Sequence, residues 1–506
     1  MVRAPDQNLH RPLHDDHCRK CSSWISRIRT TTARSRGETA MASDNLSFLD
    51  AGFLETEDSD RHASLNIGAL AIIDGPAPDQ NEFREAVAVR LLNLPHAKQK
   101  LHTAPLDVGA PSWADDLSFD LDRHLRRVAL PEPGGDEELF GFVGRVMAHR
   151  LDRDHPLWEC WVVEGLVRGR WAILAKLHHC LADGITGAKL FDAMCDEPDP
   201  RMTPESEQTP LRARAPGLVE SAEALMSPRR QLRLLSTVVS APQRMAAAAV
   251  GTVGGLARLL AEMVTTSSTT SLSGPIGRQR RYCGARATMA DIREICEVYG
   301  VTVNDVALSA IASGLRTVLL QRGERPDAHA ARTLVPVSVR SGRDRDSTHN
   351  QVSLMLPFLP VDIEDDIERL AAVHERLAAH KNQGEAEGGK AFTSLAQYGP
   401  FMPMAWAVRL ALRYPQRSVV AVATNIPGPR EVRHVLGRRI FEIFPYVPIA
   451  VRLRIGIAIL SYHDHFTFGL TGDYDTTADL GDLARTIEHA VKSLLTASGS
   501  SEPKAQ

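Results

Sequence analysis

Two adjacent histidines stand where a predicted strand ends, in the run Leu177-His178-His179-Cys180-Leu181-Ala182-Asp183-Gly184. The apolar residues 171–177 predict the strand, and the Asp-Gly pair predicts a turn into the next element. Because successive side chains on a strand point to opposite faces, His178 and His179 cannot do the same job. One can face a cleft while the other packs behind it. A neutral histidine takes a proton from a hydroxyl and returns it to a leaving group, so the pattern suits a one-step acyl transfer.

Three other interpretations of this run compete with acyl transfer. A metal site would need His178, His179, Cys180 and Asp183 to converge on one ion, but neighbouring strand positions diverge and the spacing fits no usual zinc site, so we predict no metal. A serine hydrolase would need a Gly-x-Ser-x-Gly turn, which does not accompany the run. A purely structural histidine pair is the third interpretation. The second histidine, the Asp-Gly pair and the position at a strand end argue against it.

Composition limits the class of protein. The chain has 506 residues, of which 43% are hydrophobic, enough for two or three domains with large cores. A net charge of −3 argues against a dedicated nucleic-acid binder. Seven scattered cysteines do not form a disulfide pattern, so we expect a reducing, cytoplasmic compartment. The longest uncharged apolar stretch, residues 245–257, is too short for a membrane span.

The order of predicted elements indicates two mixed α/β halves. Strands at 65–73, 160–164 and 171–177 and helices at 81–92, 137–148 and 184–194 make up the first half. The second half has strands at 332–340, 351–359, 419–424, 455–462 and 466–472, with helices at 291–299, 304–320, 365–381 and 480–494. Thr302 and Asp305 have the spacing of a helix-capping box.

The segments outside these halves have unusual compositions. Residues 1–40 are rich in Arg, Ser and Thr and contain no apolar stretch long enough for a secretory signal, so we expect either a disordered extension or an upstream start that the cell does not use. Residues 196–217 form a proline-rich linker, and arginines then punctuate the apolar segment 218–264. That segment is either a helical connector packed on both halves or a helix that also touches lipid.

Motifs along most of the chain carry a resemblance to a known family. His-His-x-x-x-Asp-Gly is the signature of the coenzyme A-dependent acyltransferase superfamily, and the whole set, in order from about residue 44 to about 490, resembles the bacterial wax ester synthase/acyl-CoA:diacylglycerol acyltransferase family. The other motifs of this set are residues 46–53, 119–124, 151–158, 274–277, 302–306, 336–340 and 424–429.

The resemblance implies a fold and a division of the chain. It implies two coenzyme A-dependent acyltransferase-like mixed-sheet domains joined by a helical crossover, with the active site in the cleft between them. The expected domains are 41–195 and 274–495, joined by the linker and connector at 196–273 and followed by a disordered tail at 496–506. Pro156-Leu157-Trp158 resembles a motif associated with the acyl channel, although a core tryptophan explains it equally.

The resemblance also implies roles for individual residues. His179 is the expected catalytic base, and His178 is expected to support its geometry. Asp183 either orients His179 or, as we favour, makes a structural ion pair, while Gly184 leaves room for substrate and eases the turn. Asn304 either contacts the oxyanion or His179 or acts as a helix cap, and Asp305 is expected to cap its helix.

The implied activity is an O-acyltransferase that uses acyl-CoA as co-substrate and needs no cofactor. It forms triacylglycerol from diacylglycerol, with wax esters from long-chain alcohols as a second product. A lipid acceptor implies peripheral association with a membrane or lipid-droplet surface. The alternatives are an acyltransferase that takes its acyl group from a carrier protein, as condensation domains do, and a non-catalytic lipid-binding protein.

Overall fold

Two six-stranded sheets form the framework of the part of the chain that the structure describes. The structure is a computed structural model that describes residues 46, 48–91, 94, 96–103, 111–181, 191, 193–196, 270–338, 352–382 and 419–500. These residues belong to one unit, Asn45–Gln506. The predictions for residues 1–40, for Asp183 and Gly184, and for most of the helix at 184–194 and of the connector at 196–273 lie outside them.

The first sheet holds the histidine pair at the end of one of its strands. Its strands are β1 (Asn66–Ile73), β4 (Leu125–Ala129), β5 (Trp158–Leu166), β6 (Arg170–His178), β11 (His434–Val435) and β12 (Arg438–Tyr446). Their order is β11-β12-β1-β6-β5-β4, and β1 is antiparallel to both β6 and β12. The predicted strands at 65–73, 160–164 and 171–177 are therefore confirmed, and the last two pair as an antiparallel hairpin.

The second sheet is built from the later part of the chain. Its strands are β7 (Arg280–Thr288), β8 (Thr333–Ser338), β9 (Val352–Met355), β10 (Ala421–Pro427), β13 (Ile455–Tyr462) and β14 (His465–Asp473). Their order is β7-β14-β13-β10-β8-β9, with β10 parallel to β8 and β13 and the remaining neighbours antiparallel. Both sheets are mixed, as the sequence predicts.

One pair of strands crosses from the second half of the chain into the first sheet. β11 and β12 follow β10 in sequence, yet β12 pairs with β1 along most of its length, from Gly68↔Tyr446 to Ile73↔Ile440. These two strands lie in the predicted domain range 274–495, yet they complete the sheet that carries the histidines. Hydrophobic pattern predicts that a strand exists but not which strand it pairs with.

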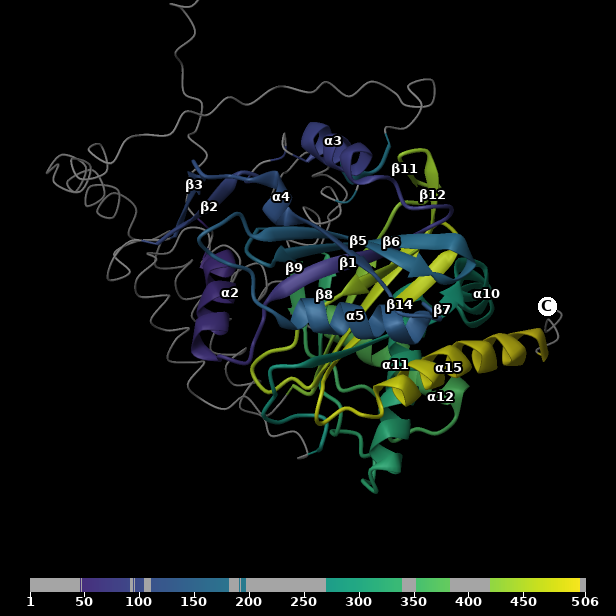
Figure 1. The fold of residues 1–506 in the computed structure, drawn as a ribbon. Coiled ribbons are helices and arrows are strands. Elements are labelled where there is room, and N and C mark those ends of the chain that lie inside the picture. The colour runs from purple at the N-terminus through teal and green to yellow at the C-terminus, as the bar shows by residue number, and fades with distance from the viewer. Residues whose placement is uncertain are drawn as a thin grey trace, which may run out of the picture. The chain divides into compact units, whose positions relative to one another are not determined.

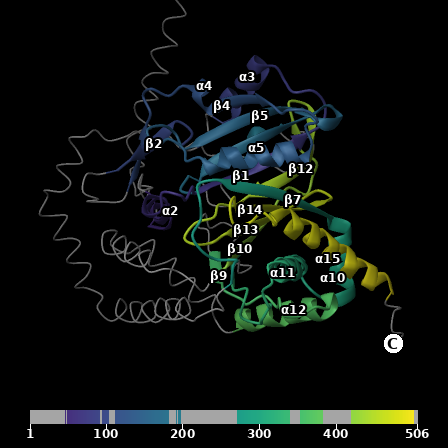
Figure 2. The same ribbon diagram turned by 60° about the horizontal axis from the view of Figure 1, so that its bottom comes forward.

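Helices cover the sheets in layers (Figure 1). The described helices are α2 (Phe48–Ser59), α3 (Gln80–Arg90), α4 (Leu121–His124), α5 (Asp136–Ala148), α10 (Met289–Tyr299), α11 (Val303–Gln321), α12 (Asp366–Asn382) and α15 (Leu480–Ser500). Buried side chains of α5 pack on one face of the first sheet, and those of α3 pack on the other. Figure 2 shows α10, α11, α12 and α15 together on one side of the second sheet, where they share its largest core.

Helix α11 lies at the centre of this layer. It is the described helix that is long and apolar enough to cross a membrane, but 67% of its most apolar stretch is buried inside the protein. Such burial is what a core helix requires, because its apolar surface is covered by α10, α12 and α15.

Helix α15 corrects the predicted carboxyl-terminal tail. The helix continues to Ser500, so a tail that begins at 496 is wrong for its first five residues. Ser498 is 5% exposed, and its hydroxyl donates to the carbonyl oxygen of Leu495 and lies 3.5 Å from a carboxylate oxygen of Glu294 on α10. Packing against α10 thus outweighs the weak helix propensity of these small residues.

Candidate active site

The backbone of the histidine pair is fixed from both sides. The N–H of His178 donates to the carbonyl oxygen of Leu157 at 3.0 Å, just before β5, and the N–H of His179 donates to Leu65 at 2.9 Å, just before β1. β6 ends at His178, and His179 begins the turn. His178 is 1% exposed, whereas His179 is only partly buried. The two side chains therefore occupy different environments, as the alternation along a strand predicts.

The ring of His178 contacts buried polar groups on both edges. Its Nδ1 accepts the backbone N–H of Cys180 at 3.1 Å, so a neutral ring carries its proton on Nε2. Nε2 points toward the carboxylate of Glu57, with Oε2 at 3.6 Å, and both side chains are 1% exposed. His178 is thus enclosed by protein groups.

Glu57 of α2 is a buried anion with several partners. Its Oε1 accepts the N–H of Leu65 at 3.0 Å, and its Oε2 accepts Nη2 of Arg153 at 2.7 Å. Burial alone would raise the pKa of Glu57, but His178, Leu65 and Arg153 outweigh burial and lower the pKa to about 2. The carboxylate is therefore charged at neutral pH.

The ring of His179 stacks on an aromatic ring. The centroids of His179 and Phe53 lie 3.7 Å apart with 21° between the planes. Phe53 lies on α2, one helical turn before Glu57. Helix α2 therefore contacts both histidines: Phe53 stacks on His179, and Glu57 lies beside His178.

The structure confirms the predicted helix cap at Asp305. Thr302 is the N-cap of α11, its Oγ1 accepts the N–H of Asp305, and the carboxylate of Asp305 accepts the N–H of Thr302 at 2.8 Å. The same carboxylate lies 2.8 Å from Nδ1 of His374 on α12. Asn304 is inside the first turn, so the interpretation of Asn304 itself as the cap is wrong.

Asn304 lies in the first turn of α11, and its predicted contact with His179 stays a prediction. Arg280, at the start of β7, donates to the carbonyl oxygen of His62 in the segment between α2 and β1, which places this end of the second sheet on the histidine side. Arg322 follows the carboxyl-terminal end of α11 and binds Asp479, in the segment after β14. The last residues of β14 pair with the start of β7. Asn304 is thus at the opposite end of a 19-residue helix about 28 Å long.

Trp158 is a core residue in this structure. Its side chain is 5% exposed, its Nε1 donates to the carbonyl oxygen of Ala97 at 2.8 Å, and its ring stacks on His124 at 4.5 Å. Burial lowers the pKa of His124, whose Nδ1 lies 2.7 Å from the carbonyl oxygen of Trp158. The core interpretation of residues 156–158 is therefore confirmed, and Leu157 contributes the carbonyl that accepts the N–H of His178.

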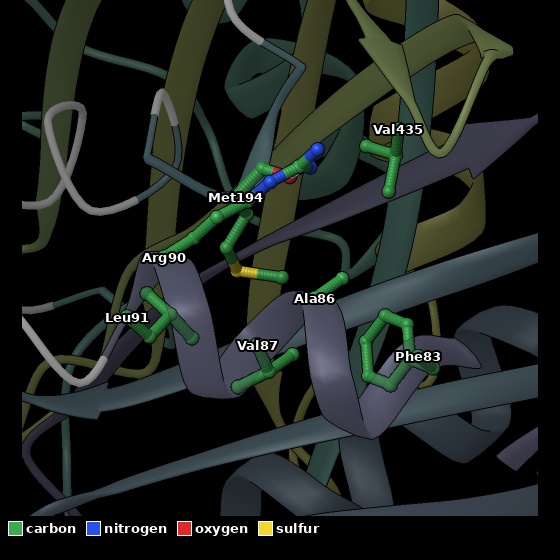
Figure 3. Close-up of a pocket in the computed structure, with 7 residues that line it drawn as sticks. All are labelled: Phe83, Ala86, Val87, Arg90, Leu91, Met194 and Val435. Atoms are coloured by element: carbon green, nitrogen blue, oxygen red, sulfur yellow. Dashed lines mark hydrogen bonds between the residues drawn. The ribbon is translucent and has the colours of Figure 1, made fainter. Parts of the chain in front are cut away.

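A small pocket lies beside α3, and neither histidine lines it (Figure 3). Its volume is about 10 Å³, enough for a single water molecule and far too small for an acyl chain. Its lining is Phe83, Ala86, Val87, Arg90, Leu91, Met194 and Val435. It is a packing gap between α3 and β11. In the described ranges, no group of three or more His, Cys, Asp or Glu side chains could hold a metal ion.

The sequence motifs contained Phe53 and Arg153 but gave neither a role, and Glu57 was missed. Phe53 and Glu57 have the i, i+4 spacing of neighbours on one helix face, and Arg153 lies in the motif at 151–158. The spacing of Phe53 and Glu57 is the signal that could have placed both side chains beside the histidine pair.

Comparisons with known proteins agree with the motif pattern. The family model of the wax ester synthase/diacylglycerol acyltransferase catalytic domain matches residues 46–307, and that of the WS/DGAT C-terminal domain matches residues 348–495. The probable diacylglycerol O-acyltransferase tgs1 of Mycobacterium tuberculosis (strain ATCC 25618 / H37Rv) is 46% identical over 452 residues, which cover 89% of this chain and 96% of that protein. A putative diacylglycerol O-acyltransferase of the same strain is 36% identical over 456 residues, which cover 90% and 92%.

Solved structures share the fold. A wax ester synthase/diacylglycerol acyltransferase from Marinobacter aquaeolei VT8 has a TM-score of 0.62 at 25% identity and covers 90% of this chain and 100% of its own. The first condensation domain of the calcium-dependent antibiotic synthetase has a TM-score of 0.53 at 14% identity, covering 92% and 98%. The second similarity is one of fold alone.

Proposed function

Because the chain belongs to the wax ester synthase/diacylglycerol acyltransferase family and is therefore an acyltransferase, we propose that it forms triacylglycerol by transferring a fatty acyl group from acyl-CoA to diacylglycerol. Ester formation from long-chain alcohols is a second activity of the same site. The observation that carries the proposal is the different burial of the two histidines. His179 is partly exposed at the end of β6, whereas His178 is enclosed by protein groups.

His179 is the general base in the proposed reaction. An alcohol hydroxyl is too weakly acidic to attack a thioester unaided, so His179 takes its proton as the new carbon–oxygen bond forms. The tetrahedral intermediate then collapses, the carbon–sulfur bond breaks, and the departing coenzyme A thiolate receives that proton from His179. No acyl-enzyme forms and no cofactor is needed, because one histidine serves both proton transfers.

The proposed substrates also suggest where the protein works. Diacylglycerol and long-chain alcohols partition into lipid, so a cytoplasmic enzyme must reach them at a membrane or lipid-droplet surface. We propose peripheral association with such a surface. Flotation of the purified full chain with vesicles that contain diacylglycerol tests this part of the proposal.

The decisive experiment compares donors and acceptors. The purified chain is incubated with labelled palmitoyl-CoA or with palmitoyl-carrier protein, and with diacylglycerol or hexadecanol, and the lipid products are resolved. We expect triacylglycerol from palmitoyl-CoA, loss of product in His179→Ala, and normal product in the control His489→Ala, whose residue is exposed on α15. Consumption of the carrier-bound acyl group alone supports the condensation-type alternative. Lipid binding without any ester supports a non-catalytic protein.

A further inference from the structure

Helix α2 presents two consecutive turns to the end of β6. Phe53 and Glu57 are four residues apart and so lie on one face of the helix. Phe53 stacks on His179, and the Glu57 carboxylate lies beside His178. The helix precedes β1, and Figure 1 shows it beside the start of that strand. A single helix is thus placed to set the orientation of two neighbouring rings.

Glu57 ties the residue before β1 to the end of β6, where the histidine pair lies. Its Oε1 accepts the N–H of Leu65, and the carbonyl oxygen of the same Leu65 accepts the N–H of His179. Its Oε2 lies 3.6 Å from Nε2 of His178. The carboxylate therefore fixes the backbone beside one histidine and the ring of the other.

Arg153 balances the buried charge of Glu57 and provides a matched comparison. Its Nη2 donates to Glu57 at 2.7 Å, and its Nη1 donates to Asp58, which is 55% exposed. Asp58 also pairs with Arg153, but it follows Glu57 directly in sequence and therefore lies on a different face of α2. Removing the Asp58 charge thus disturbs Arg153 without touching His178.

We infer that α2 is the positioning element of the active site, in which Glu57 orients the buried His178 and Phe53 fixes the plane of the His179 ring. The inference rests on the proposed role of His179 as the base. A base must lie within about 3 Å of the hydroxyl in a defined direction, and a displacement of about 1 Å costs about 100-fold in rate. The flat Phe53 ring against one face of the imidazole limits the rotation of the imidazole. It leaves the edge that carries the nitrogen atoms uncovered by Phe53.

The kinetic test uses four variants of the full chain. Phe53→Leu removes the flat surface, and Phe53→Tyr restores it. Glu57→Gln removes the charge but keeps an oxygen that accepts the N–H of Leu65, and Asp58→Asn is the matched control. We expect kcat to fall about tenfold or more in Phe53→Leu and Glu57→Gln with KM for palmitoyl-CoA within about twofold, recovery in Phe53→Tyr, and no change in Asp58→Asn.

A spectroscopic test is independent of turnover. In protein labelled with ¹³C at histidine Cε1, the His179 signal is identified by its absence in His179→Ala, and stacking on Phe53 should shift it upfield. We expect the signal to move downfield in Phe53→Leu, to return in Phe53→Tyr and to stay in place in Asp58→Asn. Circular dichroism and thermal unfolding establish that each variant is folded.

The outcomes separate this inference from the proposed function. The positioning role is overturned if kcat is unchanged in folded Phe53→Leu and Glu57→Gln. It is also overturned if the His179 signal does not move when Phe53 is replaced by Leu. A wild-type protein that forms no ester with any donor and acceptor, yet shows the stacked His179 signal, overturns the proposed function and leaves α2 as the element that orients the pair.

Discussion

Arg286 on β7 forms a two-pronged ion pair with Glu442 on β12, and this pair links the second sheet to the first. Nε and Nη2 of Arg286 lie 2.8 Å and 3.0 Å from the two carboxylate oxygens of Glu442, whose side chain is 4% exposed. Nη1 also donates to Asp136 at the start of α5. Because β12 pairs with β1, the ion pair ties the sheet that holds the histidines to its neighbour.

Arg286→Ala should destabilise the fold by about 2 to 3 kcal/mol, because it leaves the Glu442 carboxylate buried without its partner. The expected loss is less than for a fully enclosed pair, since 35% of the Arg286 side chain reaches solvent. Arg84→Ala is the control: Arg84 and Asp122 are both exposed, and their pair is worth about 0.5 kcal/mol. Urea unfolding measures both variants. Equal stability of the two would contradict the assignment of Arg286 as a link between the sheets.

His179→Ala should lower kcat about 100- to 10,000-fold, the usual contribution of a general base, with a small change in stability because the ring is partly exposed. His178→Ala should lower stability, since it opens a cavity beside the charged Glu57, and should lower kcat less than His179→Ala does, since it removes only the ring that Glu57 orients. Parallel measurement of kcat and of the thermal midpoint separates the two roles. A variant of His179 that keeps near-normal kcat would remove this residue from the reaction.

The structure places Cys180 beside the histidines, but it should take no part in catalysis. Burial raises the pKa of its thiol, the charges of Asp50 and Glu57 raise it further, and the residue is 5% exposed. Iodoacetamide at pH 8 should therefore leave Cys180 unmodified in the native enzyme and label it after denaturation, as mass spectrometry of peptides will show. Capture of an acyl group on Cys180 during turnover would refute transfer without an acyl-enzyme.

Glu57 should make stability depend on pH in the acidic range. A carboxyl whose folded pKa is about 2, against 4.5 in the unfolded chain, stabilises the fold fully above pH 4.5. That stabilisation falls by about 1.4 kcal/mol per pH unit as the pH drops from 4.5 toward 2. The difference in unfolding free energy between wild type and Glu57→Gln should therefore shrink over this range and stay constant from pH 5 to 7. A difference that grows on acidification would show that Glu57 is not charged in the fold.

Local rules predicted the parts of the site that depend on one segment. The strand that ends at His178, the different environments of the two histidines and the capping box of Thr302 and Asp305 all follow from spacing within a few residues. The carboxylate that faces His178 was not predictable in this way, because Glu57 is 121 positions earlier and meets the ring through tertiary packing. The same limit applies to β12, whose pairing with β1 no local pattern specifies.

Asn304 and Asp305 are neighbours in the first turn of α11 but should contribute to different properties of the protein. Asn304→Ala should lower kcat less than about fivefold, because its end of α11 lies opposite the end that meets Asp479. An oxyanion donor would cost about 100- to 1,000-fold. Asp305→Ala should instead lower stability by about 1 to 2 kcal/mol, because the N–H of Thr302 loses its acceptor and His374 loses its carboxylate partner. Steady-state kinetics and urea unfolding of both variants make the comparison. A large kcat defect in a stable Asn304→Ala protein would return this residue to the active site.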